Sequence, residues 1–113
     1  MKIINDTLTT IELKELAANL FKDMVKGVID VDKEILALDA ELHADLESLL
    51  LEQGSRQENL WGVNLYPDLT GDNFVEFDSM INLRPSQGNM SRGVDDERIR
   101  RRIIGVISKR ITR

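Results

Sequence analysis

Apolar residues recur at helical spacing near the start of the chain. Thr9 and Glu12 have the Thr-x-x-Glu spacing of a capping box, in which a hydroxyl and a carboxylate satisfy free amides at a helix start. The apolar positions that follow are Ile11, Leu13, Leu16, Ala17, Leu20, Phe21, Met24 and Val25. On a helical wheel they cover roughly 220° of arc, which is wider than a surface helix needs. We therefore predict a helix covered on two sides, by a sheet and by a second subunit.

Two short β-type runs and a second helix come next. Residues 28–31 and 35–38 are apolar, with Asp32, Lys33 and Glu34 between them, and predict a hairpin; one continuous helix through Asp39 is the alternative. In the segment of residues 44–53 and just before it, one helix face carries Leu42, Leu46, Leu49 and Leu50, and Gly54 suits the left-handed position after a last helical turn. This segment is predicted to be a helix.

Alternation takes over in the second half of the chain. Residues 60–66 predict a strand ended by Pro67, and residues 74–83 give the clearest alternating pattern. In that run Phe77, Ser79, Ile81 and Leu83 point one way, and Glu76, Asp78, Met80 and Asn82 point the other. A polar loop precedes a last helix from about residue 96 to 112, capped by Asp95. The order α-β-β-α-β-β-α, with an optional strand at residues 2–5, favours an antiparallel sheet packed with helices: a single α+β domain over residues 1–113.

Composition narrows the class of protein. The 113 residues include no cysteine, which excludes a disulfide scaffold, a thiolate zinc site and a cysteine nucleophile. No apolar run is long enough to span a membrane, and the first residues lack the apolar core of a signal peptide. We expect a soluble, cytoplasmic protein with no cofactor. Whether it is an enzyme does not follow from the sequence.

The formal charge of −5 is unevenly distributed. Residues 1–91 hold 7 basic and 17 acidic groups, whereas residues 92–113 hold 8 basic and 3 acidic groups. Such asymmetry predicts an interaction surface, either internal or external. We expect the two parts to offset each other within the fold or across a dimer.

The first candidate site surrounds the only histidine. His43 and Glu47 are four residues apart and share a helix face, a spacing that can hold one divalent metal ion. The site could be completed by Asp39, Glu41 or Asp45. The same carboxylates are also ordinary helix-start and surface residues. A metal-dependent hydrolase centred on Glu41, His43, Asp45 and Glu47 is therefore an alternative hypothesis.

The second candidate is the loop that leaves the alternating run. Asn82, Arg84, Asn89 and Arg92 lie in a polar segment that runs toward a helix start, where free amides and guanidinium groups make an anion pocket. The loop has no Gly-x-x-x-x-Gly-Lys pattern, so a nucleotide P-loop is excluded. A well-bonded structural connection is the competing interpretation.

The third candidate is the basic face of the last helix. Arg98, Arg101, Arg102, Lys109 and Arg113 share a face that could neutralise nucleic-acid phosphates. The face has no aromatic residue for base stacking, and the rest of the chain is acidic. Nucleic-acid binding is therefore a further alternative and not the preferred function.

Several of these segments carry a family resemblance. Residues 41–45 (Glu-Leu-His-Ala-Asp), Gly54-Ser55, residues 60–64 (Leu-Trp-Gly-Val-Asn) and residues 79–89 resemble a small uncharacterised family of bacterial and archaeal hypothetical proteins. The resemblance covers residues 20–110, implies no activity, and suggests a complete protein.

The preferred hypothesis is a non-catalytic module that binds a protein partner or a small anionic ligand, as a homodimer. Asn82, Arg84, Asn89 and Arg92 would form its recognition loop. No membrane partner is expected.

Overall fold

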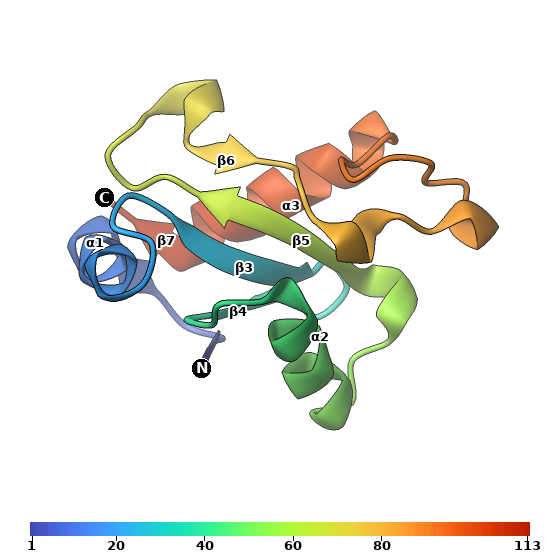
Figure 1. Ribbon diagram of the computed structural model, residues 1–113, viewed down its shortest axis with the longest axis horizontal. Helices are drawn as coiled ribbons and strands as arrows, with labels where there is room; N and C mark the ends of the chain where they lie inside the picture. The colour runs from blue at the N-terminus through green and yellow to red at the C-terminus, as the bar shows by residue number, and fades with distance from the viewer.

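The computed structural model describes residues 1–113 and contains three α-helices and seven strands (Figure 1). The helices are α1 (Thr10–Asn19), α2 (His43–Glu52) and α3 (Glu97–Arg110). The strands are β1 (Lys2–Ile4), β2 (Leu8–Thr9), β3 (Val25–Asp30), β4 (Ile35–Leu38), β5 (Leu60–Leu65), β6 (Val75–Glu76) and β7 (Ile111–Thr112). The predicted α-β-β-α-β-β-α order is confirmed, and the optional strand at residues 2–5 is present as β1, whereas β2 and β7 were not predicted. No helix is both long and apolar enough to cross a membrane.

Five strands form one antiparallel sheet in the order β1-β4-β3-β5-β6. The predicted hairpin is confirmed as β3 and β4, and β3 also pairs with β5 along its whole length, from Val25 opposite Leu65 to Asp30 opposite Leu60. The two remaining strands, β2 and β7, form a separate parallel pair that joins the start of α1 to the end of α3. The protein is therefore an α+β fold, as predicted.

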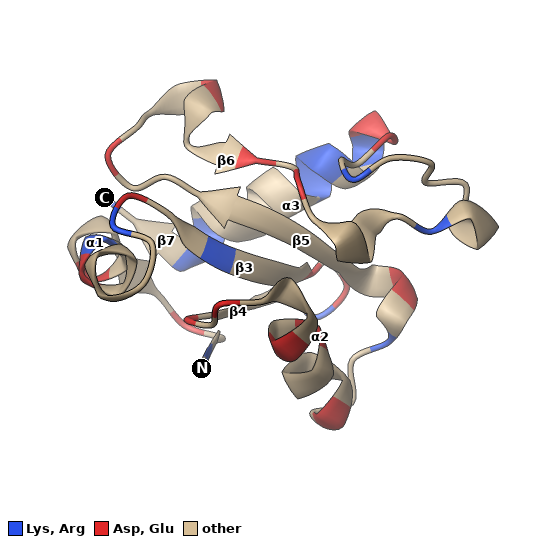
Figure 2. Ribbon diagram, in the orientation of Figure 1, with Lys and Arg blue, Asp and Glu red and all other residues tan.

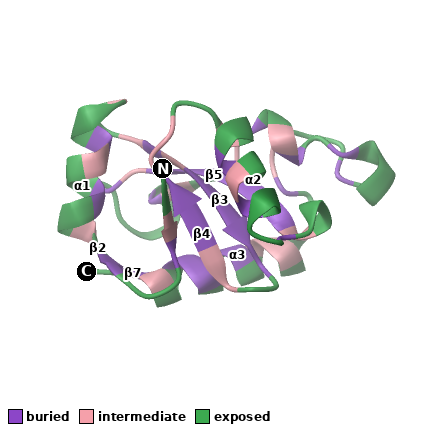
Figure 3. Ribbon diagram, turned by 90° about the horizontal axis from the view of Figure 1, so that it is seen from below, coloured by how far each residue is buried: buried purple, intermediate pink, exposed green.

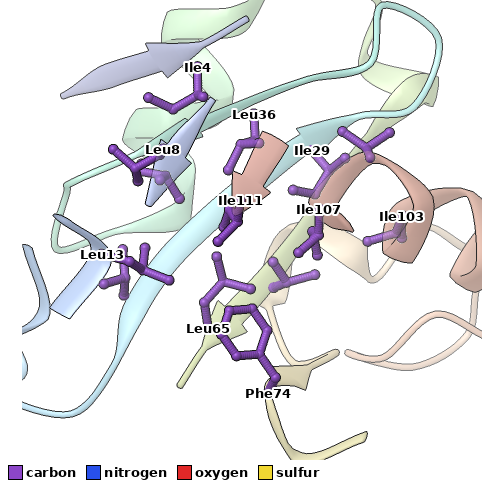
Figure 4. Close-up of a cluster of buried hydrophobic side chains, with 14 of the residues drawn as sticks. Ile4, Leu8, Leu13, Ile29, Leu36, Leu65, Phe74, Ile103, Ile107 and Ile111 are labelled. Atoms are coloured by element: carbon purple, nitrogen blue, oxygen red, sulfur yellow. The ribbon is translucent and has the colours of Figure 1, made fainter. Parts of the chain in front are cut away.

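The helices cover the sheet from both sides, and the buried strands lie between α2 and α3 (Figure 3). Because successive side chains of a strand point to opposite faces, each face has its own apolar cluster. The larger one lies on the face of α1 and α3 (Figure 4) and includes Leu13, Leu65 and Ile107. The smaller one lies under α2 and consists of Val28, Ala37, Leu46, Leu50 and Leu60.

The first helix is shorter than its apolar pattern predicts. The capping box of Thr9 and Glu12 is present, but α1 ends at Asn19 and the chain turns before Val25 begins β3. The six residue pairs that β3 forms with β5 stabilise the fold more than two further turns of an exposed helix would. The predicted 220° apolar arc is therefore wrong, and with it goes the argument from helix width for a second subunit.

The run with the clearest alternation is also not a long strand. Only β6 forms, and the chain then leaves the sheet: Ser79 Oγ accepts a hydrogen bond from Ile81 N and starts a 3₁₀ turn over Met80–Asn82. Phe77 packs against the larger cluster and Ile81 against the smaller one, so the predicted common face does not exist. A local side chain to backbone bond competes successfully with ladder pairing here.

The last helix begins one residue later than predicted. Its N-cap is Asp96, whose side chain accepts from Arg98 N, while Asp95 accepts from Met90 N and Ser91 Oγ and so closes the preceding loop. Those hydrogen bonds lower the pKa of Asp95 and of Asp96 below the usual range of a carboxyl group.

Lys and Arg positions colour several parts of the α3 ribbon in Figure 2, and several of these side chains contact other parts of the chain. Lys109 Nζ lies 3.3 Å from Glu34 Oε1, and Arg102 donates to the carbonyl of Val31. Arg110 donates to the carbonyls of Glu34 and Asp6. Lys109 and Glu34 therefore form an ion pair of the expected kind within the fold, whereas Arg102 and Arg110 bond to backbone carbonyls.

Candidate functional site

A row of polar side chains crosses the α2 face at one end of the sheet. In the ladder, Lys26 of β3 is opposite Asn64 of β5, which is opposite Glu76 of β6. Residues paired across strands point to the same face, so these three side chains lie next to one another. The neighbouring pair, Val28 and Gly62, already belongs to the part of the face that α2 covers. The polar row therefore begins where the apolar cover of α2 stops.

The N-terminus of α2 meets this row and encloses a pocket of about 230 Å³, which we call the α2 pocket. Its walls are Lys26, Leu42, His43, Ala44, Asn64, Asp78, Ser79, Met80, Ile81 and Arg92. Leu42 occupies the N-cap position and supplies no side-chain hydrogen bond, so the first amides of α2 are left without a side-chain cap. Uncapped amides and the helix dipole favour negative charge at this end of the helix.

His43 is held in one orientation by the backbone of β5. Its Nε2 lies 2.8 Å from the carbonyl oxygen of Val63, and because a carbonyl only accepts, Nε2 carries the proton. In the neutral ring, Nδ1 then holds the lone pair. Burial lowers the pKa of His43, with a smaller lowering from the charge of Lys26, against the opposing effects of the Val63 carbonyl, of Asp78 and of the neighbouring Asn64 side chain. The imidazole is therefore neutral near pH 7.

Asn64 contributes an oxygen that the protein leaves unpaired. The residue is only 6% exposed, and its amide nitrogen donates to Glu76 Oε1 at 2.8 Å and to the carbonyl of Asp78 at 3.3 Å. Its Oδ1 is buried and has no hydrogen-bond partner. Leaving such an acceptor unsatisfied costs about 1–3 kcal/mol. An unpaired buried acceptor in a pocket wall is a position to which a donor from a ligand or a water molecule can bond.

Charges of both signs surround the pocket. Arg92 Nε lies 2.8 Å from Asp78 Oδ1, and both side chains are partly exposed. Lys26 Nζ lies 5.1 Å from the centre of the Phe21 ring, a contact that holds the ammonium beside the pocket. Arg92 and Asp78 pair with each other, so Lys26 and the start of α2 supply the positive charge of the pocket wall that no carboxylate in the wall offsets. Together they favour a small anion.

Among the predicted loop residues, Arg92 lines the α2 pocket, and Asn82 and Asn89 organise the loop that carries it. The side chain of Asn82, which is fully buried, accepts from Gly62 N and donates to the carbonyls of Gly62 and Arg92. Asn89 donates to the carbonyls of Asn82 and Gly93 and accepts from Asp95 N. These bonds consume the polar atoms of both amides and fix the backbone from which Arg92 projects.

Arg84 is likewise committed to the fold. Its guanidinium donates to the carbonyls of Ile81, Gln57 and Leu60 and lies 4.3 Å from the centre of the Trp61 ring. Burial lowers the pKa of Arg84, and the negative charge of Glu47 opposes that shift. The predicted recognition loop is thus mostly a hydrogen-bonded scaffold, and it presents one side chain to the pocket.

The proposed metal ligands do not gather at one point. His43 and Glu47 are four residues apart on α2 as predicted, but Glu41 and Asp45 are exposed. No group of three or more His, Asp or Glu side chains lies close enough to hold a metal ion. His43 turns toward the Val63 carbonyl, so the structure lends no support to a metal centre on Glu41, His43, Asp45 and Glu47, and that alternative stays an untested prediction.

Sequence reasoning missed Lys26, Asn64 and Asp78 as site residues. One signal was present: Asn64 is the polar position in the otherwise apolar strand Leu60–Leu65, whose residues are all buried. A polar residue in such a strand needs a hydrogen-bonding reason to be there. Lys26 and Asp78 gave no comparable signal, because their approach to His43 depends on strand register and on the turn after β6.

A family model described as "Protein of unknown function (DUF5674)" matches residues 2–110, nearly the whole chain. No curated protein matches the chain at a significant level, and no solved structure does so either.

Proposed function

The chain belongs to the DUF5674 family of proteins of unknown function, and we propose that it is a binding module that takes a small anion into the α2 pocket. Phosphate and small hydroxy carboxylates are the class of ligand that we expect. The pocket is below the roughly 300 Å³ of a site for drug-sized ligands, which fits a ligand of a few heavy atoms.

The observation that carries the proposal is the convergence of three independent features on one pocket. The uncapped first turn of α2 supplies free amides, and Lys26 supplies positive charge from another element. Beside them lies Asn64, more than nine-tenths buried, with an unpaired Oδ1. A helix N-terminus alone is an ordinary feature, but here it shares a pocket with a buried polar group that lacks a partner.

The acceptors in the pocket say more about the ligand. Nδ1 of the neutral His43 is a hydrogen-bond acceptor, as is Asn64 Oδ1, so a ligand that also carries an O–H or N–H donor is favoured. Near pH 7 phosphate keeps such a proton and sulfate does not, although the two ions have similar shapes. We therefore expect phosphate to bind more tightly than sulfate.

The first prediction is that removing the positive charge of Lys26 weakens phosphate binding. Lys26→Met keeps the apolar stem beside Phe21 but removes the ammonium group, and a charge-assisted hydrogen bond of about 1.5–3 kcal/mol corresponds to roughly 10- to 100-fold in affinity. Binding is measured by following backbone amide shifts of His43 and Ala44 as inorganic phosphate is added.

The matched control is Lys14→Met, because Lys14 is an exposed lysine of α1, on the other side of the sheet, paired only with Asp68. We expect the control to bind phosphate like the wild type, and we expect glycolate to bind more tightly than acetate. Equal binding by Lys26→Met and the wild type would contradict the proposal. So would the absence of any shift at His43 and Ala44 with phosphate and with glycolate.

The other functions are supported less well. Four cations of the basic α3 face have partners within the chain: Arg98 pairs with Asp96, Arg101 with Glu97, Arg102 with the Val31 carbonyl and Lys109 with Glu34. Nucleic-acid binding would have to compete with these contacts, and the absence of a gel shift at low salt would reject it. The homodimer stays a prediction, now without support from α1.

A further inference from the structure

A second and larger hollow lies on the opposite side of the molecule from α2. It is a groove of about 1000 Å³, which we call the α3 groove, between helix α3 and the chain from Gly71 to Phe77. Its apolar lining comes from Phe74, Val75 and Phe77 on one wall and from Ile104, Ile107 and Ile111 on the other. Ile104 is 40% exposed, and it is the lining isoleucine that projects furthest into solvent.

The groove runs beside a free edge of the sheet. The terminal strand, β6, pairs only with β5. Tyr66 N donates to the carbonyl of Phe74, and Asn64 is opposite Glu76. Since backbone groups alternate in direction along a strand, those of Val75, between Phe74 and Glu76, point away from β5. The side chain of Val75 meanwhile lines the groove, so a free edge and an apolar wall adjoin each other.

The shape of the groove favours an extended occupant. Its lining reaches from Glu97 at the start of α3 to Arg113 beyond its end. At 1.5 Å per helical residue, the helix spans roughly 20 Å, the length of about six residues in an extended strand. A compact small molecule would leave most of this length uncovered, whereas an extended peptide would fill it.

The charges along the groove favour an acidic occupant. Arg100 lies toward one end and Arg113 at the other, against the acid Asp72, while Arg101 and Glu97 offset each other as a pair. Glu97 is engaged by Arg101 at 3.0 Å, and the Arg113 guanidinium lies 5.3 Å from the centre of the Phe74 ring. A second copy of this chain in the groove by strand pairing at β6 would bring two sets of these arginines together, which like-charge repulsion opposes.

We infer that the α3 groove binds an extended segment of a partner protein as an added strand at β6, a segment with alternating apolar side chains and Asp or Glu toward its ends. The backbone of Val75 would give the main-chain hydrogen bonds of strand addition, and the isoleucines of α3 would receive alternate side chains. This inference is independent of anion binding in the α2 pocket, which lies on the other face of the sheet.

The test is selection of displayed random ten-residue peptides on the immobilised full chain. We expect enrichment of peptides that alternate Val, Ile or Phe with other residues and carry Asp or Glu near the ends. Ile104→Glu, which places a negative charge in the groove at an exposed helix position, should weaken binding of an enriched peptide at least tenfold, as measured by fluorescence anisotropy.

The matched control is Ile11→Glu, because Ile11 is 70% exposed on α1 and lies outside the groove. It should bind the enriched peptide like the wild type, as should Lys26→Met. No enrichment, enrichment of basic peptides, or unchanged binding by Ile104→Glu would overturn the inference. It would also be overturned if the wild type sedimented as a dimer and Ile104→Glu as a monomer, because a second copy would then occupy the groove.

Discussion

Replacement of Asn82 by aspartate is expected to destabilise the protein by about 3–5 kcal/mol, the range for an uncompensated charge in a buried site. The Asn82 side chain is fully buried and its amide nitrogen donates to two carbonyls, those of Gly62 and Arg92. A carboxylate would turn an oxygen toward them instead. Urea denaturation at pH 7 measures the loss of unfolding free energy. The loss should be smaller near pH 4, because burial raises the pKa of the new carboxyl group and the protonated form can still donate one hydrogen bond.

The control for this change is Asn73→Asp, the same chemical substitution at an exposed position next to β6. It should alter the free energy of unfolding by less than about 0.5 kcal/mol. If Asn82→Asp instead kept wild-type stability and lost only phosphate binding, Asn82 would be a recognition residue, and the description of the loop as a scaffold would be wrong.

The second large effect is expected for Arg84→Met, which keeps much of the apolar stem and removes the guanidinium. The carbonyls of Ile81 and Leu60 would lose the guanidinium as a donor, that of Gln57 would keep only the Leu60 N–H, and the Trp61 ring would lose the stacked cation. Each unsatisfied buried acceptor costs about 1–3 kcal/mol. The variant no longer buries a charged guanidinium, which offsets part of this cost, so we expect the free energy of unfolding to fall by roughly 2–4 kcal/mol. Thermal and urea unfolding both measure it.

Arg56→Met serves as the comparison, because the Arg56 side chain is largely exposed and pairs only with Glu58. Its unfolding free energy should stay within about 0.5 kcal/mol of the wild type. A folded Arg84→Met protein of undiminished stability that fails to bind phosphate would assign Arg84 to the ligand rather than to the fold, contrary to its buried contacts.

Local patterns in the sequence predicted most of the architecture. Three predicted features are present: the capping box at Thr9, the leucine-rich helix α2 and the β3–β4 hairpin. Each of them depends on residues that are close together in the sequence. The predictions failed where a distant partner decided the outcome. Val25 belongs to β3 and not to the first helix, because β3 forms six residue pairs with β5. The sequence of residues 10–25 contains no signal for this pairing, because β5 lies 35 residues further along the chain.

The turn after β6 shows the same limit at the site itself. A side chain on Gly62 would place its Cβ 2.6 Å from both the Cβ and the Oγ of Ser79, so the loop can lie directly on β5 only because that position is glycine. Asn82 then fastens the loop there. An alternating pattern reveals neither the space that Gly62 leaves for the loop nor the hydrogen bonds of Asn82 that hold the loop in place. The sequence therefore predicts a strand over residues 74–83 and does not predict the α2 pocket.

Only some of the residues that form the α2 pocket could be predicted from the sequence. His43 and Arg92 stand out in the string as the single histidine and as a cation in a polar loop, and both line the α2 pocket. Lys26, Asn64 and Glu76 become a row only through the registers of β3, β5 and β6. Residue type therefore indicated the chemistry, whereas strand register determined the place.

The most direct test of anion binding is the pH titration of the His43 imidazole by NMR, which the presence of a single histidine makes unambiguous. In the free protein its pKa should lie below the ordinary value of 6.5, because burial disfavours the charged ring. Stability should accordingly fall as pH decreases below 6.5, since the unfolded chain then binds the proton more readily.

Adding phosphate at constant ionic strength, with chloride as the reference, should raise the pKa of His43, because an anion in the same pocket stabilises the imidazolium. Lys14→Met should show the same rise, and Lys26→Met should need at least about tenfold more phosphate to reach it, in line with the loss of one charge-assisted hydrogen bond. If the pKa of His43 were the same in phosphate as in chloride, the binding of a small anion in the α2 pocket would be contradicted.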